Sequence, residues 1–316
     1  MGIQDLKGRD FLKITDLNSS EIQELLHLAK ELKSGERSFR TQKELGLLFY
    51  KASTRTRVSF TVAMHRLGGQ VIDLNPNVTQ VGRGEPISDT ARVLDRYLDV
   101  LAIRTFKQED LEIFAKYTKV PIINALSDLE HPCQILADLL TIQESFEELS
   151  GVKLAYLGDG NNVAHSLLLG CALTGVDISL ATPINYQPLR KIVELGRNIA
   201  GDSSAAPAGY RSKIIITDDP MKAAQDAQVI YTDVWASMGQ EDSADSRLPV
   251  FKNYQVNGTI LNNAHPEAIV LHCLPAHRGE EITEAVIEGR QSKVWEQAEN
   301  RMHAQQALLA ALLGLC

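Results

Sequence analysis

The chain has 316 residues, of which 44% are hydrophobic, and a formal net charge of −8. This length favours two domains of roughly 150 residues each, and the apolar share is large enough to fill two cores. An acidic chain with dispersed charges lacks the broad basic surface of a nucleic-acid or anionic-membrane binder. A few converging arginines can still form a positive pocket, so a small anionic ligand remains possible.

The four cysteines lack the spacing of a disulfide framework, which favours reduced thiols in a cytosolic enzyme. The first ten residues are polar and charged, unlike a secretory signal. The longest apolar stretch, at 307–316, is too short to span a bilayer. We therefore expect a soluble, cytoplasmic protein that does not enter a membrane.

A helix is predicted to begin after Asn18, because Asn18 and Glu21 have the spacing of a capping box. Apolar residues follow at helical spacing until Gly35. Short apolar runs then alternate with amphipathic stretches, which indicates a parallel sheet with helices packed on it. The strand-like runs are 45–50, 71–74, 100–103 and 120–125, and the helical patterns are 54–67, 89–97 and 109–118.

A long helix is predicted at about 131–149, where this alternation pauses. Strand-like runs resume at 152–157, 176–181, 213–217, 229–232 and 268–273, and residues 201–209 suit a surface loop. We expect an α/β protein with two domains, each a parallel sheet flanked by helices. The expected boundaries are 1–148 and 149–290, with a final helix in 291–316, at about 292–313, packing back on the first domain.

The segment Ser53-Thr54-Arg55-Thr56-Arg57 follows the first predicted strand and begins a helix, with Ser53 as its cap. A helix start offers unpaired N–H groups and a partial positive charge. Hydroxyls and two guanidinium groups within one turn make the segment suitable for a phosphate, because arginine provides forked donors. The alternative is an ordinary capped helix start in solvent.

Two weaker signals lie further along this half of the chain. Residues 80–90 form a polar loop that leads into a helix capped by Ser88, which also suits a loop without a ligand. Arg104 ends the third predicted strand, where parallel sheets place ligand contacts. A lone arginine at that point is equally suited to a salt bridge.

The segment His131-Pro132-Cys133-Gln134 opens the long predicted helix, with proline at an early position. His131 is able to donate to a carbonyl oxygen, and Gln134 is able to bind an amide. A histidine that only caps the helix is the alternative.

Residues 157–163, with the sequence LGDGNNV, follow a strand and open a helix, as in dinucleotide-binding proteins. However, Val163 stands at the last glycine position, and the next strand ends in Thr182 and Pro183 rather than in an acid that would hold a ribose. A dinucleotide-dependent oxidoreductase is therefore a remote alternative. Asn162 is better suited to donate to a substrate carboxylate at the carboxyl edge of the sheet.

Two more segments follow strands in the second half. Asp233 stands at a strand end, where it suits an ammonium group, and the turn Ser237-Met238-Gly239 could close over an aliphatic chain. The segment 272–275, His-Cys-Leu-Pro, precedes His277 and two glutamates, which raises the question of a metal site. No paired C-x-x-C or H-x3-H motif accompanies them, so we expect no metal. A thiol beside a ligand fits better.

Together and in this order, these segments resemble the aspartate and ornithine carbamoyltransferase family along essentially the whole chain. The marks shared by the family are Ser-Thr-Arg-Thr-Arg at 53–57 and His-Pro-x-Gln at 131–134. Asp-x3-Ser-Met-Gly at 233–239 and His-Cys-Leu-Pro at 272–275 are similar to its ornithine branch. An aspartate enzyme is expected to have His-x-Leu-Pro-Arg and no Ser-Met-Gly loop. Ala52 departs slightly from the Pro or Ser common there.

The resemblance implies transfer of the carbamoyl group of carbamoyl phosphate to the δ-amine of L-ornithine, giving L-citrulline and phosphate without a metal or an organic cofactor. Aspartate, putrescine and N-acetylornithine are the alternative acceptors. A putrescine enzyme would need no contacts for an α-carboxylate or α-ammonium group. The resemblance also implies a cis peptide bond before Pro275, and a homotrimer, or a multiple of it, with active sites at its interfaces.

The family assigns roles to residues at matching positions. For the phosphate of carbamoyl phosphate these are Ser53, Thr54, Arg55 and Thr56, with Gln80 from across a subunit contact. For its carbamoyl group they are Arg104, His131 and Thr56 at the carbonyl, and Gln134 and the Leu274 carbonyl at the NH2 group. Arg301 reaches the same substrate from the last helix. On the ornithine side these are Asn162 for the carboxylate, Asp233, Ser237 and Met238 for the α-amino end, and Cys273 beside the reacting amine. Arg104, His131 and Cys273 are the expected catalytic residues.

Overall fold

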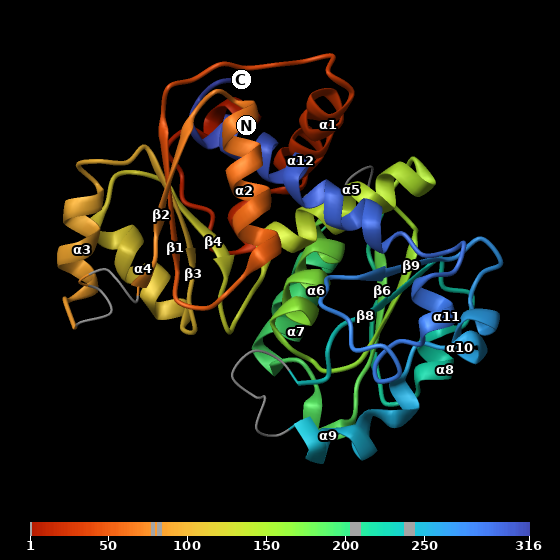
Figure 1. Cartoon of the computed structure of the whole chain (residues 1–316). Helices are drawn as coiled ribbons and strands as arrows, with labels where there is room; N and C mark the ends of the chain where they lie inside the picture. The colour runs from red at the N-terminus through yellow and green to blue at the C-terminus, as the bar shows by residue number, and fades with distance from the viewer. Residues whose placement is uncertain (1, 77–79, 81–83, 203–209, 237–243) are drawn as a thin grey trace. The chain divides into compact units, whose positions relative to one another are not determined.

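The computed structural model describes residues 2–76, 80, 84–202, 210–236 and 244–316. The chain divides into two compact units, Met1–Ala137 with Asn300–Cys316, and Asp138–Glu299. Each unit holds one parallel sheet flanked by helices (Figure 1), which confirms the predicted fold class. Within the described part of the chain, no helix is long and apolar enough to cross a membrane.

The sheet of the first unit has the order β2-β1-β3-β4, with every neighbouring pair parallel. Right-handed crossovers place helices on opposite faces when the strand order changes direction. Accordingly, α2 lies on one face and α3 and α4 lie on the other (Figure 1). The elements are β1 Glu44–Phe49, α2 Thr54–Arg66, β2 Gln70–Leu74, α3 Ile87–Leu94, β3 Val100–Arg104, α4 Gln108–Tyr117 and β4 Ile122–Leu126.

The chain's first and last long helices, α1 (Ser19–Ser34) and α12 (Val294–Leu312), both contribute to the first unit. The capping box before α1 is confirmed: Asn18 Oδ1 accepts the N–H of Glu21 at 3.0 Å, and Gly35 ends the helix with a φ of 81°. Lys33 Nζ donates to Asn300 Oδ1 at 2.8 Å, which joins α1 to α12. The prediction that the final helix returns to the first domain is confirmed.

The sheet of the second unit has the order β7-β6-β5-β8-β9, again parallel throughout. In Figure 1, α6 and α7 lie on one face of it and α8, α10 and α11 on the other. The elements are β5 Lys153–Leu157, α6 Asn162–Thr174, β6 Asp177–Ala181, α7 Arg190–Gly201, β7 Ile214–Thr217, α8 Pro220–Ala224, β8 Val229–Thr232, α9 Ala244–Phe251, α10 Gly258–Asn263, β9 Ile269–His272 and α11 Glu284–Ile287.

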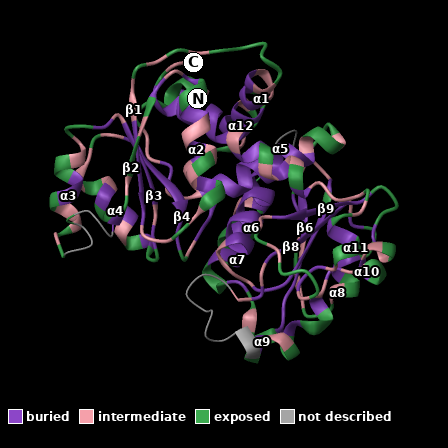
Figure 2. Cartoon of the chain, viewed as in Figure 1, coloured by how far each residue is buried: buried purple, intermediate pink, exposed green. Residues whose placement is uncertain are grey.

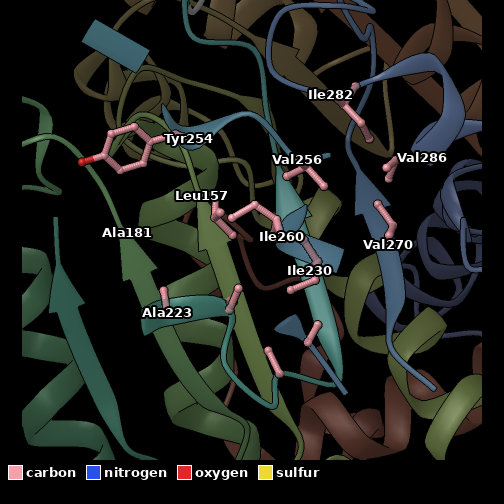
Figure 3. Packing of buried hydrophobic residues seen from close by; sticks show 14 of the residues in the cluster. Leu157, Ala181, Ala223, Ile230, Tyr254, Val256, Ile260, Val270, Ile282 and Val286 are labelled. Atoms are coloured by element: carbon pink, nitrogen blue, oxygen red, sulfur yellow. The ribbon is translucent and has the colours of Figure 1, made fainter. Parts of the chain in front are cut away.

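The core of the second unit combines aliphatic residues of the strands with the aromatic side chains of Trp235, Phe251 and Tyr254. Leu157, Ile230 and Val270, from three neighbouring strands, point into one cluster with Ile260 and Ile282 (Figure 3). On the other face, α6 is buried from Val163 to Thr174 (Figure 2), because its sequence is apolar nearly all round. Both faces of the central strands are therefore covered, so ligands can approach only the strand ends.

Two sequence predictions about helix ends are wrong. The helix α5 (Pro132–Phe146) stops before Leu149, because Glu147 takes a left-handed conformation with a φ of 66°. The helix α3 begins at Ile87 with Pro86 at its cap, so Ser88 lies in the first turn and is not the cap. Residues 203–209 of the predicted 201–209 loop lie outside the described residues. Short 3-10 helices occur at Ile3–Leu6, Ile14–Asp16, Ile184–Tyr186 and Lys252–Tyr254.

Candidate active site

The strand order of the first unit changes direction between β1 and β3. Phe49 and Arg104 are paired in register at the carboxyl ends of these strands. Their following helices lie on opposite faces, so the connecting loops diverge and leave a crevice where ligands of α/β proteins bind. The start of α2 and the Arg104 side chain therefore share the edge of the sheet predicted from the sequence.

The motif at 53–57 begins α2 as predicted, with Ser53 at the cap position. Among the described residues, the Ser53 hydroxyl accepts no capping bond, so only its position agrees with the prediction. Thr56 is buried, whereas Thr54 and Arg55 are exposed at the helix start. Arg57 pairs with Asp73, and its guanidinium lies 4.8 Å from the centre of the Phe49 ring. Arg57 is thus already paired within the protein, whereas the role of Arg55 at an anion stays a prediction.

Arg301 joins three segments that are far apart in the sequence. Its Nη2 donates to Thr56 Oγ1 at 3.1 Å, and its Nη1 donates to Gln134 Oε1 at 2.5 Å. The side chain is 5% exposed, so the charge lies within the protein rather than in solvent. The start of α2, the first turn of α5 and the middle of α12 thus meet around one guanidinium group.

His131 lies directly before α5 and is buried. Burial, together with the positive charges of Arg301 and Arg104, holds the pKa of His131 well below its usual range. The imidazole is therefore neutral at physiological pH and keeps one N–H donor and one acceptor nitrogen. A neutral donor between two arginines suits a polar, uncharged group such as a carbonyl.

The neighbouring Cys133 is a structural thiol. It is buried, and its Sγ donates to the backbone carbonyl of Asn124 at 3.4 Å. Burial raises the pKa of Cys133 to about 12, even though Arg301 acts in the opposite direction. The variable position of the His-Pro-x-Gln motif is thus filled by an inert core residue.

Gln80 is exposed on the first unit. Its backbone carbonyl accepts the N–H of Glu85 at 3.3 Å, and its side chain borders a small hollow lined also by Leu48, Leu74 and Thr90. Residues 81–83 of the predicted 80–90 loop, and 77–79 before it, lie outside the described residues. The role of Gln80 across a subunit contact stays a prediction.

In the second unit, the strand order changes direction between β5 and β8. Leu157 pairs with Thr232, and Thr232 pairs with His272, so the residues after these strand ends lie side by side. Asp233 Oδ1 accepts the Cys273 thiol proton with a donor–acceptor distance of 2.8 Å. The structure therefore brings together a buried carboxylate and a half-buried thiol that are 40 positions apart in the sequence.

Asn161, the residue before the predicted Asn162, contacts Asp233. Asn161 Nδ2 donates to Asp233 Oδ2 at 2.8 Å, and its Oδ1 caps α6 by accepting the N–H groups of Val163 and Ala164. Asn162 is half-buried, and its Oδ1 lies 3.0 Å from the N–H of Val163. Sequence reasoning singled out Asn162 and missed Asn161, although asparagine is a preferred cap residue and could have been recognised by that signal.

Comparisons with known proteins identify the family of the chain. Residues 9–144 match the family model of the aspartate/ornithine carbamoyltransferase carbamoyl-P binding domain, and residues 150–312 match that of the Asp/Orn binding domain. The chain belongs to the aspartate/ornithine carbamoyltransferase family. The ornithine carbamoyltransferase of Synechocystis is 66% identical over 315 residues, covering 100% of each chain, and that of Nostoc punctiforme is 65% identical over 98% of each.

Solved carbamoyltransferase structures are also similar. The ornithine carbamoyltransferase from Gloeobacter violaceus is 54% identical, with a TM-score of 0.86, and the match covers 96% of this chain and 98% of that one. The enzyme from Pyrococcus furiosus is 47% identical, with a TM-score of 0.92 and 98% of each chain covered. The cis peptide bond that the family implied is present between Leu274 and Pro275.

Gly160 explains why a carbamoyltransferase sequence resembles a dinucleotide loop. Its N–H donates to the carbonyl of Tyr186 at 2.8 Å, and a Cβ placed on it would lie 2.2 Å from the nitrogen of Pro188. The glycine therefore permits the close approach of a neighbouring loop. It serves the packing of this unit, which accounts for a Gly-x-Gly pattern without the third glycine of the dinucleotide fingerprint.

Arg247 was missed by sequence reasoning. Its Nη1 donates to Asp159 Oδ2 at 2.8 Å and to the Trp235 carbonyl at 2.6 Å, and its guanidinium lies 4.9 Å from the centre of the Tyr186 ring. Burial raises the pKa of Asp159, an effect that Arg247 partly offsets. No local pattern marks such an arginine, because its partners are distant in the sequence.

Residues 237–243 lie outside the described residues, between Trp235 and Arg247. Ser237 and Met238 belong to this segment, so their predicted contacts with the α-amino end of ornithine stay predictions.

His272 has both ring nitrogens engaged. Nε2 lies 3.0 Å from Glu281 Oε1, and Nδ1 accepts the N–H of Leu274 at 2.8 Å. His272, Asp233 and Cys273 offer ligand atoms within 4.8 Å of one another, but these two hydrogen bonds leave no lone pair on the imidazole for a metal. The second group of metal-type ligands, His277, Glu280 and Glu281, shares the same Glu281 carboxylate.

Proposed function

We propose that this protein transfers the carbamoyl group of carbamoyl phosphate to the δ-amine of L-ornithine, giving L-citrulline and phosphate. The observation that carries the acceptor assignment is the Asp233–Cys273 contact of 2.8 Å at the carboxyl edge of the second sheet. The Asp233 carboxylate suits the α-ammonium group of ornithine, and the neighbouring Cys273 thiol suits its uncharged δ-amine. Relatives that are 66% and 65% identical carry the name ornithine carbamoyltransferase.

For carbamoyl phosphate, we assign the phosphate to the start of α2, as the family resemblance implies. Ser53, Thr54, Arg55 and Thr56 supply hydroxyls, a guanidinium group and the N–H groups of a helix start, which together favour a dianion. Gln80 completes this set from a neighbouring subunit. This assignment places the phosphate at the positive end of the helix dipole.

For the carbamoyl group, we assign the carbonyl oxygen to Arg104, His131 and Thr56. The neutral imidazole donates an N–H, while Arg104 supplies the positive charge that stabilises the developing oxyanion. Arg301 holds Thr56 and Gln134 at 3.1 Å and 2.5 Å, which orients both for the substrate. The NH2 group falls to Gln134 and, from the resemblance, to the Leu274 carbonyl.

For ornithine, we assign the carboxylate to Asn162 and the α-ammonium group to Asp233 with Ser237 and Met238. Cys273 lies beside the reacting δ-amine. The bond from Asn161 to Asp233 then fixes the carboxylate that receives the ammonium group. Fixed partners of this kind lower the entropy lost when the substrate binds.

The reaction begins with attack by the neutral δ-amine on the carbamoyl carbon. The carbonyl electrons move to oxygen to form a tetrahedral intermediate, the bond from carbon to the phosphate oxygen breaks, and the proton lost by the amine is balanced on the departing phosphate. An amine with a pKa of about 10.4 is neutral in roughly one molecule in 250 at pH 8, which corresponds to about 3 kcal/mol. Selecting this neutral form is therefore a major task of the site.

We also propose a homotrimer, or a multiple of it, and a cytoplasmic location, both on the basis of the family resemblance. The trimer gives Gln80 a partner subunit on which to act. Equilibrium sedimentation of the purified chain tests the assembly.

A colorimetric ureido assay tests the activity. Carbamoyl phosphate is supplied with L-ornithine and, in parallel, with aspartate, putrescine or N-acetylornithine. Turnover with ornithine is expected, because Asp233 and Asn162 match its α-ammonium and carboxylate groups. Turnover with one of the other amines and none with ornithine would reject the proposal.

A further inference from the structure

A buried chain of hydrogen bonds lies behind the segment that carries Cys273. His272 Nδ1 accepts the N–H of Leu274 at 2.8 Å, and His272 Nε2 lies 3.0 Å from Glu281 Oε1. The side chains of His272 and Glu281 both have 0% of their surface exposed. Because Nδ1 accepts a bond, the proton of a neutral imidazole is on Nε2 and is donated to Glu281. Glu281 thereby selects the tautomer that can hold Leu274.

Glu281 is itself held firmly in place. Its Oε1 also accepts the N–H of His277 at 2.6 Å, and its backbone carbonyl accepts the N–H of Val256 at 2.8 Å. The next residue, Ile282, is fully buried and points into the core cluster with Val256 and Val270 (Figure 3). The carboxylate is therefore anchored to the core of the second unit and not to a mobile surface.

The end of β9 is supported from the other side as well. The N–H of His272 donates to Gln297 Oε1 at 2.8 Å, and Gln297 Nε2 donates to Asp138 Oδ1 at 2.6 Å. The strand pairing stops at His272, so the sheet gives no further support to Cys273 or Leu274. Beyond this point, His272 holds the backbone.

Leu274 needs such support. Its φ is 59°, a left-handed conformation that is unfavourable for a residue with a branched side chain. The bond from its N–H to His272 Nδ1 holds the peptide unit between Cys273 and Leu274, from which this turn starts. Because this peptide unit joins Cys273 to Leu274, holding it limits the movement of both the Cys273 thiol, which contacts Asp233, and the Leu274 carbonyl that follows.

We propose that Glu281 is a positioning residue for the reaction, acting through His272 on the Cys273–Leu274 turn. The inference rests on the proposed function, because that function assigns Cys273 to the reacting amine and the Leu274 carbonyl to the carbamoyl NH2 group. Glu281 does not contact a substrate. It holds the Cys273 thiol and the Leu274 carbonyl in place, as residues that hydrogen-bond to active-site ligands do in other proteins.

The first test compares Glu281→Ala with Glu281→Gln in the full-length enzyme. Loss of an outer-shell partner typically lowers activity about 10- to 100-fold, which we expect for kcat in Glu281→Ala. The KM for carbamoyl phosphate should change by a smaller factor than kcat, because the phosphate contacts at 53–56 are untouched and only the contact of the Leu274 carbonyl with its NH2 group is disturbed. Glu281→Gln should recover most of kcat, since its amide oxygen still accepts from His272 and His277. Glu280→Ala, at a partly exposed neighbour, is the matched control and should resemble the wild type.

The native fold and the position of the Cys273–Leu274 turn are measured separately from the rate of catalysis. Melting temperatures identify variants that keep the native fold, and the alkylation rate of Cys273 by iodoacetamide reports the position of the thiol in a Cys316→Ser background. Cys133 and Cys171 are buried and should react slowly. A folded Glu281→Ala with wild-type kcat and wild-type alkylation would overturn the inference. If the wild type fails to carbamoylate ornithine, the proposed function fails while alkylation still tests the turn.

A second pair of variants decides the matter if Glu281→Ala does not fold. His272→Asn and His272→Leu introduce side chains with the same number of heavy atoms and the same branching, and neither reaches Glu281 as the imidazole does. Only asparagine keeps an acceptor for the N–H of Leu274. The asparagine variant should retain a kcat about tenfold or more above that of the leucine variant. Equal kcat values for the two folded variants would contradict the proposed role of the Leu274 bond.

Discussion

Arg301 donates to Gln134 at 2.5 Å across 167 positions of sequence. The same guanidinium also donates to Thr56, so one residue of the last helix orients two polar groups that belong to separate motifs of the first domain. The planar guanidinium offers donors in a fixed fork, which suits two acceptors on separate segments. The last helix is thus part of the candidate carbamoyl phosphate site.

Arg301→Met should lower kcat by about 10²- to 10³-fold, the usual effect of removing a preorganised donor from an active site. Arg301→Lys should restore little of this, because an ammonium group is a single point charge and cannot span Thr56 and Gln134. Steady-state kinetics with both substrates provides the measurement. Arg190→Met, at a side chain that is 92% exposed, is the control and should be neutral. Full activity of the lysine variant would show that the forked geometry is unimportant.

Arg55 and Arg57 should differ sharply although both belong to the same motif. Arg55→Ala should weaken carbamoyl phosphate binding by about 10- to 100-fold, the range for a lost charged hydrogen bond. Arg57→Ala should leave that affinity nearly unchanged and lower the melting temperature, because Arg57 pairs with Asp73 and lies over Phe49. Calorimetric titration with inorganic phosphate and thermal unfolding separate the two effects. The reverse pattern would mean that Arg57 is the phosphate ligand.

His131 should make the protein less stable in acid. Its pKa is lowered in the folded state by burial, Arg301 and Arg104, and is about 6.5 when unfolded. Between those values the unfolded chain binds a proton that the folded chain does not, so the free energy of unfolding falls as pH drops below about 6.5. In His131→Asn the free energy of unfolding should fall less steeply on acidification, by up to about 1.4 kcal/mol per pH unit. Urea unfolding of both proteins at several pH values measures this, and parallel curves would count against it.

Activity should rise with pH through the substrate amine. Because His131 stays neutral and Cys133 stays protonated across the neutral range, neither explains a change in rate there. The logarithm of kcat/KM for ornithine should increase by about one per pH unit between pH 6 and 9, following the neutral amine. A flat profile would show that attack by the neutral amine does not limit the rate.

The two neighbouring asparagines should have separable effects. Asn162→Ala should raise the KM for ornithine about tenfold or more, as expected for a lost bond to a carboxylate. Asn161→Ala should instead lower the free energy of unfolding by about 0.5–2 kcal/mol, because Asn161 caps α6, with a further loss of activity through Asp233. Chemical unfolding combined with ornithine kinetics distinguishes them. Wild-type stability of Asn161→Ala would contradict the capping role.

Local signals in the sequence were sufficient for much of the fold. The strand at Val229–Thr232 and the helix at Thr54–Arg66 were predicted to within a residue, because apolar spacing and chain-breaking residues act over a few positions. The cap at Ser88 was wrong, since proline at position 86 fixes a backbone angle that already starts the helix. Helix ends depend on such competition between neighbours.

The site was only partly accessible from the sequence. Thr56 and Gln134 were singled out from their own segments and Arg301 through the family resemblance, but the bonds among them could not be inferred from spacing. Arg247 gave no signal as a site residue, and Glu281 stood out only as one of two glutamates considered for a metal. A buried charged side chain is recognised by its partners, and those partners are set by the tertiary fold.

The neutral imidazole between Arg104 and Arg301 has a further consequence. Guanidinium groups stay protonated at every pH that a cell reaches, and His131 stays unprotonated there. The positive charge of this pocket is therefore constant, and the enzyme's attraction for a phosphate dianion should not respond to acidification or alkalinisation of its surroundings. Any sensitivity of the reaction to acidity would then enter through the substrates, by protonation of the amine or of the phosphate, whose second pKa is about 6.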